Sequence, residues 1–144
     1  MNNNTEIKKL LSRILRYSKV DLEKRLAKTS SGMTPLQYAV LTLIYSGKKS
    51  IREISREMLV SPPSLVPVVD FLENKKMVIR RSDPKDRRKI PIEITSKGSA
   101  LVKRIREGLD SSPVSKSLRK MGERKVKIIT KLLKELVENI EPRI

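Results

Sequence analysis

Apolar residues recur with helical spacing over most of this chain. At residues 6–28 a stripe of leucines and isoleucines predicts an amphipathic helix, which a polar run ending in glycine closes. Residues 115–141 place apolar side chains at i, i+3, i+4 and i+7, and they predict a last helix that stops before Pro142. A further helix is expected to begin after Thr95 and to break at Pro113. Long helices are therefore expected at both ends of the chain.

Shorter helices are predicted between residues 34 and 72. Two of them open at a capping box, in which Ser or Thr is followed three residues later by Gln or Glu, and the caps are Thr34 and Ser50. After the second of these helices comes Ser61, and then a segment with several apolar residues. A short helix, a tight turn and a second helix form the pattern of a helix-turn-helix.

Two short strands are predicted around a charged tip. Residues 78–81 and 90–94 form the strands, and isoleucines stand at every second position of the second strand. Pro91 cannot donate to a strand ladder, so we expect it on an edge with its nitrogen facing outward. The tip begins at the turn Asp83-Pro84 and carries several cations. A hairpin of this kind fits a DNA groove, because phosphates line both of its walls.

The composition favours one domain with an aliphatic core and a polyanionic partner. The chain has 144 residues, 38% of them hydrophobic, and its aromatic residues are limited to three tyrosines and one phenylalanine. Its 33 basic and 16 acidic residues give a net charge of +17, and phosphates would neutralise this excess with release of counterions. The excess is +6 over residues 1–48, +5 over 49–98 and +6 over 99–144, so contacts could extend beyond the hairpin.

Cysteine and histidine are both absent. This absence excludes disulfides, Cys/His metal sites, thiol nucleophiles and the usual general base of enzymes. The sequence also has no recognisable pair of catalytic carboxylates and no phosphate-binding loop. We expect neither an enzyme nor a cofactor or bound metal. No apolar run has transmembrane length and no signal-peptide core is present, which favours a cytoplasmic protein. Abundant lysine and isoleucine with a single glutamine favour a thermophilic, archaeal source.

The order of elements and several motifs resemble the MarR family of transcriptional regulators. Asp83-Pro84-Lys85-Asp86-Arg87-Arg88, followed by Ile94-Thr95-Ser96-Lys97-Gly98, is similar to the family pattern D-P-x-D-x-R … L-T-x-x-G. Residues 69–73, Val-Asp-Phe-Leu-Glu, resemble the V-D-x-L-E of the family's recognition helix, and residues 34–41 resemble the start of its second helix. The resemblance covers nearly the whole chain.

The resemblance implies a mainly α (α+β) fold, a winged helix-turn-helix with long N- and C-terminal dimerisation helices. Within a single domain of residues 1–144, it places the DNA-binding core at 34–98 and the dimerisation region at 5–30 and 99–144. The implied function is repression of transcription by a homodimer on an inverted repeat in double-stranded DNA, with a helix in each major groove and a wing in the adjoining minor groove. In the family a small anionic, frequently phenolic, effector often relieves such repression.

The terminal helices give a separate reason to expect a homodimer. Each carries one apolar stripe, and a core of residues 34–98 is too small to cover both stripes. The two helices could pack on each other within one chain. Interleaving the helices of two chains would bury more area. It would also match two DNA-binding cores, the reading heads of the dimer, to the two halves of a palindromic site, so we favour the homodimer.

In the wing, the resemblance assigns DNA contact to Lys85, Arg87, Arg88 and Lys89. Either Lys85 or Arg87 is expected to enter the minor groove. Arg88 is expected to pair with Asp86 in an arginine–carboxylate fork that holds the hairpin in shape. The alternative is a solvated turn whose ion pairs contribute little.

The recognition helix departs from the family pattern. Residues 61–68 read Ser-Pro-Pro-Ser-Leu-Val-Pro-Val, where the family commonly has hydroxyl, amide and arginine side chains. The positions expected to read DNA are Ser61, Pro62, Ser64, Leu65 and Pro67. Only the two serines can hydrogen-bond bases, whereas the prolines and Val66 could touch thymine methyl groups.

Pro67 makes a regular recognition helix costly. With Ser61 as the cap, Pro67 would stand in the helix interior at a cost of up to ~3 kcal/mol. With Ser64 as the cap, Pro67 would occupy a position where no N–H is needed. We therefore expect a helix that starts near Ser64 or bends at Pro67. Sequence discrimination should be weak, with most of the affinity coming from phosphates and the wing.

Further candidates follow from position alone. Phosphate contacts are expected from the first helix of the helix-turn-helix and its surroundings, at Ser31, Thr34, Arg52, Arg56 and Lys75. By position in the resemblance, the best candidates for an effector pocket are Arg16, Tyr17 and Tyr38. The tyrosines could instead be core or interface residues with a hydrogen-bonded hydroxyl.

Two alternatives to a regulator remain open at this point. A low-specificity architectural or chromatin-like DNA-binding protein would fit the uniform positive charge and the apolar recognition helix. A winged-helix interaction module would use the face Val66-Pro67-Val68 to contact another protein. Loss of DNA binding on mutating Arg87 and Arg88 would count against the interaction module.

Overall fold

The computed structural model describes residues 2–86 and 89–141. The chain forms two compact units, a central unit of residues 19–108 and a terminal unit of residues 1–18 with 109–144. Helix α1 (Asn3–Ala27) crosses the boundary between them. The central unit is wider than the predicted core of residues 34–98, because Leu26 and Leu101 on either side of that range are buried in its interior.

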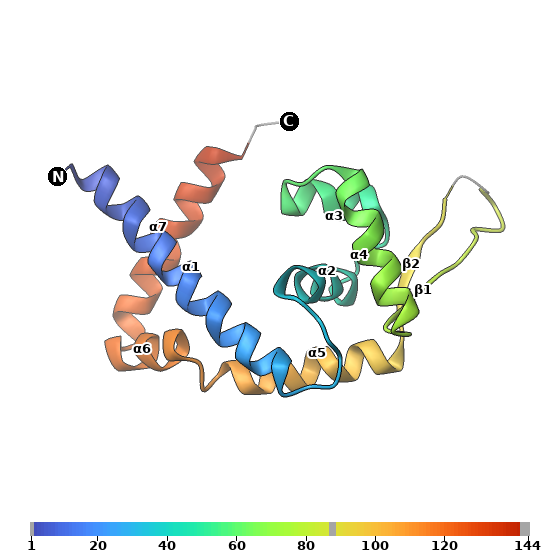
Figure 1. Ribbon diagram of the computed structural model, residues 1–144. Helices are drawn as coiled ribbons and strands as arrows, with labels where there is room; N and C mark the ends of the chain where they lie inside the picture. Colours follow the sequence, from blue (N-terminus) through green and yellow to red (C-terminus); the bar gives the residue numbers. More distant parts are fainter. Residues whose placement is uncertain (1, 87–88, 142–144) are drawn as a thin grey trace. The chain divides into compact units, whose positions relative to one another are not determined.

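The central unit has the elements expected of a winged helix-turn-helix (Figure 1). They are the end of α1, then α2 (Pro35–Tyr45), α3 (Ile51–Met58), α4 (Pro62–Asn74), β1 (Val78–Arg80), β2 (Ile92–Ile94) and α5 (Ser96–Leu109). The prediction of a mostly helical fold with one small antiparallel sheet is confirmed.

Helix starts follow local capping chemistry. The Gln37 N–H donates to Thr34 Oγ1 at 3.2 Å and the Thr34 N–H donates to Gln37 Oε1 at 2.9 Å, which confirms the first capping box. The Glu53 N–H donates to the Ser50 hydroxyl at 3.1 Å. The returning bond differs from the prediction, because the Glu53 carboxylate accepts from the N–H of Lys49 instead of that of Ser50. In both helices a free N–H at the start gains a partner.

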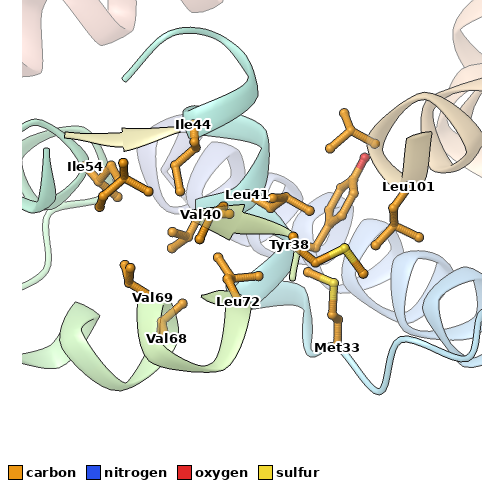
Figure 2. Close-up of a cluster of buried hydrophobic side chains, with 14 of the residues drawn as sticks. Met33, Tyr38, Val40, Leu41, Ile44, Ile54, Val68, Val69, Leu72 and Leu101 are labelled. Carbon is orange, nitrogen blue, oxygen red and sulfur yellow. The ribbon is translucent and has the colours of Figure 1, made fainter. Parts of the chain in front are cut away.

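The core of the central unit is aliphatic and centres on α2. Val40 and Leu41 are fully buried, and Figure 2 shows them among side chains such as Ile54 of α3 and Leu72 of α4. Strand β1 adds Val78, which is also fully buried. Full burial of an aliphatic side chain of this size contributes about 1.5–3 kcal/mol. Because α2 packs against α3, α4 and β2, it fixes the helix-turn-helix relative to the sheet.

The sheet is anchored beyond its own short ladder. On the outer side of β2, the Ile92 N–H donates to the Lys49 carbonyl at 2.8 Å, which ties the hairpin to the loop before α3. Pro91 lies just before β2, where its carbonyl accepts from the Arg81 N–H at 2.9 Å and no ladder bond needs its nitrogen. The register pairs Val78 with Ile94, Ile79 with Glu93, and Arg80 with Ile92.

The start of α5 packs closely against β1. Thr95 Oγ1 accepts from the Gly98 N–H at 3.1 Å, and the Thr95 N–H donates to the Met77 carbonyl at 3.0 Å. Gly98 is buried against the same carbonyl, and a methyl group added to it would overlap the Met77 oxygen. The T-x-x-G part of the motif therefore allows a helix and a strand to approach more closely than any side chain would permit.

The terminal unit contains two helices where one was predicted over residues 115–141. They are α6 (Pro113–Met121) and α7 (Glu123–Ile140). Gly122 between them has φ 91°, a left-handed value that favours glycine and cannot belong to a right-handed helix. The prediction of one uninterrupted helix is wrong, because this glycine is a break between two helices.

The apolar stripes of the terminal unit are uncovered within one chain. On α7, Leu132 and Ile140 are 58% and 71% exposed, and on α1 Leu15 is 69% exposed. Neither α6 nor α7 has a buried residue among those that the structure describes. Among the described residues, 2–86 and 89–141, none of the helices combines the length and the apolar character that a membrane span requires.

Replacing Gly98 by alanine tests the close approach of α5 to β1. The added methyl group must displace the Met77 backbone, so we expect a loss of about 2 kcal/mol in the free energy of unfolding, measured by urea denaturation. Gly108→Ala in the same helix is the control, because there the methyl group meets the end of the long Arg25 side chain, which can turn aside, and no backbone atom has to move. Equal stability of the two variants would contradict this account.

Candidate nucleic-acid interface

Helix α4 begins earlier than expected. It starts at Pro62 with Ser61 as its cap residue, so the predicted start near Ser64 is wrong. Prolines suit its first two positions, which need no N–H, and the first backbone bond runs from the Ser64 N–H to the Ser61 carbonyl at 3.0 Å. Pro67 therefore lies inside the helix, where it cannot donate to the carbonyl of Pro63. The bend expected at Pro67 stays a prediction.

The exposed face at the start of α4 is apolar. Leu65, which was predicted to read DNA, is 1% exposed and belongs to the core, so this assignment is wrong. Val68 is 7% exposed, and the face Val66-Pro67-Val68 is therefore not the continuous surface that a protein-interaction module would need. The Ser61 and Ser64 hydroxyls lie 2.7 Å apart and bond each other. The apolar side chains exposed beside these two serines are Pro62, Pro63, Val66 and Pro67.

Arg80 at the end of β1 joins the hairpin to α4. Its Nη2 donates to Asp70 Oδ1 at 2.7 Å, its Nη1 donates to Glu73 Oε1 at 3.1 Å, and its backbone N–H donates to Glu73 Oε2 at 3.1 Å. The Arg80 side chain is only 24% exposed. Sequence reasoning missed this contact. The available signal was the pair of carboxylates in the V-D-x-L-E motif of a helix expected to face DNA.

The hairpin beyond the sheet presents cations to solvent. Lys85 and Lys89 are exposed, and the Lys85 N–H donates to the Asp83 carboxylate at 2.8 Å, which shapes the turn before the tip. Arg87 and Arg88 lie outside the described residues, and so does the fork predicted for the second of them. The described part of the wing is thus a hairpin with a lysine on each side of its tip.

The predicted phosphate contacts divide into exposed and buried positions. Arg52 and Arg56 are exposed on α3, Thr34 is exposed at the cap of α2, and Lys75 is exposed at the end of α4. Ser31 is 7% exposed, and its hydroxyl lies 2.7 Å from that of a neighbouring threonine. The first four side chains are available to a ligand, whereas Ser31 serves local structure.

A basic pocket of about 300 Å³ in the central unit was not predicted. It lies between the loop after α1, the end of α4 and helix α5. Within this lining, Lys97 Nζ donates to the Lys75 carbonyl at 3.0 Å. The described residues that line the pocket include no carboxylate. Lys97 and Arg104 stand at i and i+7 on α5, but Lys75 comes from a distant part of the sequence, so no spacing pattern could indicate that it joins them. The polar lining includes Thr29, Ser31, Lys75, Lys97 and Arg104.

Tyr38 has a buried phenol without a hydrogen-bond partner among the described residues. The residue is 5% exposed, and Figure 2 shows its ring at the side of the core cluster where Leu101 lies. Burial raises the pKa of the Tyr38 phenol, and the positive charge of Arg106 opposes this with a smaller effect. Arg16 and Tyr17 are exposed in the terminal unit. The effector pocket expected from these side chains stays a prediction.

Comparison with known proteins agrees with the winged helix-turn-helix. A family model described as MarR family matches residues 31–89. The HTH-type transcriptional regulator MhqR of Bacillus subtilis (strain 168) is 31% identical over 128 residues, which cover 88% of this chain and 86% of MhqR. The chain belongs to the MarR family. It is accordingly a DNA-binding transcriptional regulator, and proteins of the MarR family act as dimers.

Solved structures share the MarR fold along nearly the whole chain. FabT of Streptococcus pneumoniae in complex with DNA has a TM-score of 0.81 at 20% identity, covering 96% of this chain and 97% of FabT. The transcriptional repressor CouR bound to a 23-mer DNA duplex has a TM-score of 0.74 at 23% identity and covers 89% of each chain. CouR from Rhodococcus jostii RHA1 bound to p-coumaroyl-CoA has a TM-score of 0.75 at 24% identity, covering 96% of this chain and 94% of CouR.

The relatives do not support the source predicted from composition. MhqR and two further MarR-type regulators that match this chain come from Bacillus subtilis, which leaves the expected thermophilic archaeal source without support. A high lysine content has a simpler explanation in a DNA-binding protein, because lysine neutralises phosphates.

Replacing Arg80 by alanine tests the link between α4 and the hairpin. Loss of the two guanidinium bonds to Asp70 and Glu73 should lower the free energy of unfolding by about 1–2 kcal/mol, while the backbone N–H of residue 80 keeps its bond to Glu73. It should also speed hydrogen exchange at the amides of β1 and β2. The control is Arg81→Ala, which removes an exposed ion pair with Glu93 and should cost less than about 0.5 kcal/mol. Equal effects of the two variants would argue against a special role for Arg80.

Proposed function

We propose that the protein is a homodimeric repressor in which α4 of each protomer enters a major groove and the hairpin tip enters the adjoining minor groove. The observation that carries this proposal is the joining of α4 and the hairpin by Arg80 into one body with exposed cations around it. A helix and a hairpin held in one orientation can engage two neighbouring grooves together. In this proposal the protein acts in the cytoplasm, where its DNA lies.

Phosphate contacts supply a large share of the proposed affinity. The exposed cations Arg52 and Arg56 lie on α3, which packs against α4, and Lys85 and Lys89 lie on the hairpin. A net charge of +17 adds attraction that does not depend on DNA sequence. We propose Lys85 or Arg87 as the residue that enters the minor groove, with Arg88 beside it and Thr34 as a further phosphate contact.

The uncovered stripes on α1 and α7 support the homodimer. Side chains such as Leu132, Val137 and Ile140 are at least half exposed in a single chain, and water is an unfavourable surrounding for them. A twofold interface would cover the same stripe in both chains and place two reading heads on one operator.

Repression is proposed to be relieved by a small anionic or phenolic effector. CouR, a repressor of similar fold, is known in a complex with p-coumaroyl-CoA. In this chain, the unpartnered hydroxyl of buried Tyr38 would gain a hydrogen-bond partner from such a ligand. We propose Tyr38 as a contact of this ligand.

One observation favours a second candidate, a low-specificity architectural protein. The exposed start of α4 is almost without hydrogen-bond donors, so it could bind many DNA sequences similarly. Selection of bound fragments from genomic DNA separates the two functions. A regulator gives a few sites upstream of genes, whereas an architectural protein gives fragments spread over the genome.

Double replacement of Lys85 and Lys89 by alanine tests the wing. Kd should rise by the same factor for operator and unrelated DNA, and the slope of log Kd against log salt should fall by about 2, which is ~1 for each phosphate contact removed. Wild-type discrimination between operator and scrambled DNA should stay below ~10³. Fluorescence anisotropy over a salt series measures both quantities.

A matched control removes the same charge from α7. Lys131→Ala with Lys134→Ala lowers the net charge equally but leaves the hairpin intact, so its salt slope should change much less. If both double variants bind alike, the wing does not contact phosphates.

Double replacement of Leu132 and Leu136 by glutamate tests the dimer. Charges on the exposed stripe of α7 should convert the dimer to a monomer, measured as mass by light scattering after gel filtration. Operator binding should fall at least tenfold, since one reading head is lost. Lys131→Glu, on the opposite side of α7, is the control and should remain dimeric. A dimeric double variant would place the interface elsewhere.

A further inference from the structure

We propose that α4 recognises DNA by contact with thymine methyl groups, so that the operator carries thymines at the positions that this helix faces. The contact surface is the apolar face formed by Pro62, Pro63, Val66 and Pro67. This inference rests on the proposed entry of α4 into the major groove, and it names the bases that the helix selects.

The face has the continuity that such a contact requires. Pro63, Val66 and Pro67 stand at i, i+3 and i+4 of α4, a spacing that places side chains next to one another on a helix. All of them are exposed, including Val66 at 41%, while Leu65, Val68 and Val69 of the same helix turn into the core. Proline rings and a β-branched side chain have few rotamers, so little side-chain freedom is lost when the face meets another surface.

The same face has few side chains that can donate hydrogen bonds to base edges. Between Pro62 and Glu73, Ser64 is the one side chain of α4 that can donate, and its hydroxyl shares a 2.7 Å bond with that of Ser61. One of the two hydroxyl protons is used in that bond, which leaves one donor for a base. Asp70 accepts from Arg80 and carries a negative charge that phosphates repel.

The chemistry of base edges then selects thymine. Thymine is the base that presents a methyl group in the major groove, and apolar side chains are its usual protein contact. Cytosine at the same place would turn an amino group toward proline and valine, and that donor would lose its water without gaining a partner. Removal of one buried methyl group weakens binding by about threefold to fourfold.

The charges around the face favour DNA as the partner over a protein. Arg52 and Arg56 are exposed on α3, which packs against α4, and Lys75 is exposed at the far end of the helix. Cations on the neighbouring helix and at the end of α4 can meet the phosphate backbones while the apolar face meets a row of base methyl groups.

The experiment replaces thymine by deoxyuridine, which lacks only the methyl group. An operator obtained by genomic selection is prepared with deoxyuridine at all thymines of the protected major-groove segments, and Kd is measured by fluorescence anisotropy at constant salt. We expect Kd to rise at least tenfold, because several methyl groups that touch α4 are removed together. Deoxyuridine outside the protected segments is the control and should leave Kd unchanged.

Variants assign the effect to α4. Val66→Ala should bind the thymine operator more weakly than wild type but show a smaller ratio between the deoxyuridine and thymine operators. Pro63→Ala provides a second, independent test of the same face. Lys85→Ala should weaken both operators equally and keep the wild-type ratio, because it acts on phosphates.

Two outcomes overturn the inference. Equal binding of the thymine and deoxyuridine operators by the wild-type protein would show that methyl groups are not read, while the proposed DNA-binding function would stand. An unchanged ratio in both Val66→Ala and Pro63→Ala would show that another part of the protein reads them. Failure of the wild-type protein to bind any selected DNA would instead refute the proposed function itself.

Discussion

The contact of Arg80 with Asp70 and Glu73 is the interaction on which the arrangement of the interface depends. The sheet that carries the hairpin has three residues in each strand, which is too short to hold a direction by itself. The guanidinium fixes the base of the hairpin on α4, and the backbone bond between Ile92 and Lys49 fixes its other side. The hairpin thereby becomes an extension of the helix-turn-helix, and less freedom is lost when both parts meet DNA.

Different residues of this chain would supply the affinity for DNA and the recognition of its base sequence. Positive charge is spread over the whole length, so attraction to phosphates does not depend on the few residues of α4. The exposed start of α4 has prolines and a valine where hydrogen-bonding side chains would be expected. In the proposed binding mode, α4 would rely on shape and apolar contact in the major groove, and the surrounding cations would supply the affinity.

The terminal unit imposes a different constraint, because it cannot satisfy its apolar surface alone. Its helices α6 and α7 bury none of their described residues, whereas α2 in the central unit buries Tyr38, Val40, Leu41 and Ile44. Covering these stripes by a second copy couples folding of the terminal unit to protein concentration. Dimer formation and the spacing of two reading heads then follow from one surface.

Capping, periodicity and turn chemistry act between residues close in the chain, so the order of most helices, the Thr34 cap, the hairpin and the family could be predicted from the sequence. That prediction failed at Gly122 and at the start of α4, where local signals permitted two answers. Three features became visible in the folded chain alone: Leu65 lies in the core, Arg80 meets Asp70 and Glu73, and Lys75 shares a pocket with Lys97 and Arg104. The reason is physical: these contacts join residues whose proximity is set by packing around α2, and no spacing in the sequence encodes that packing.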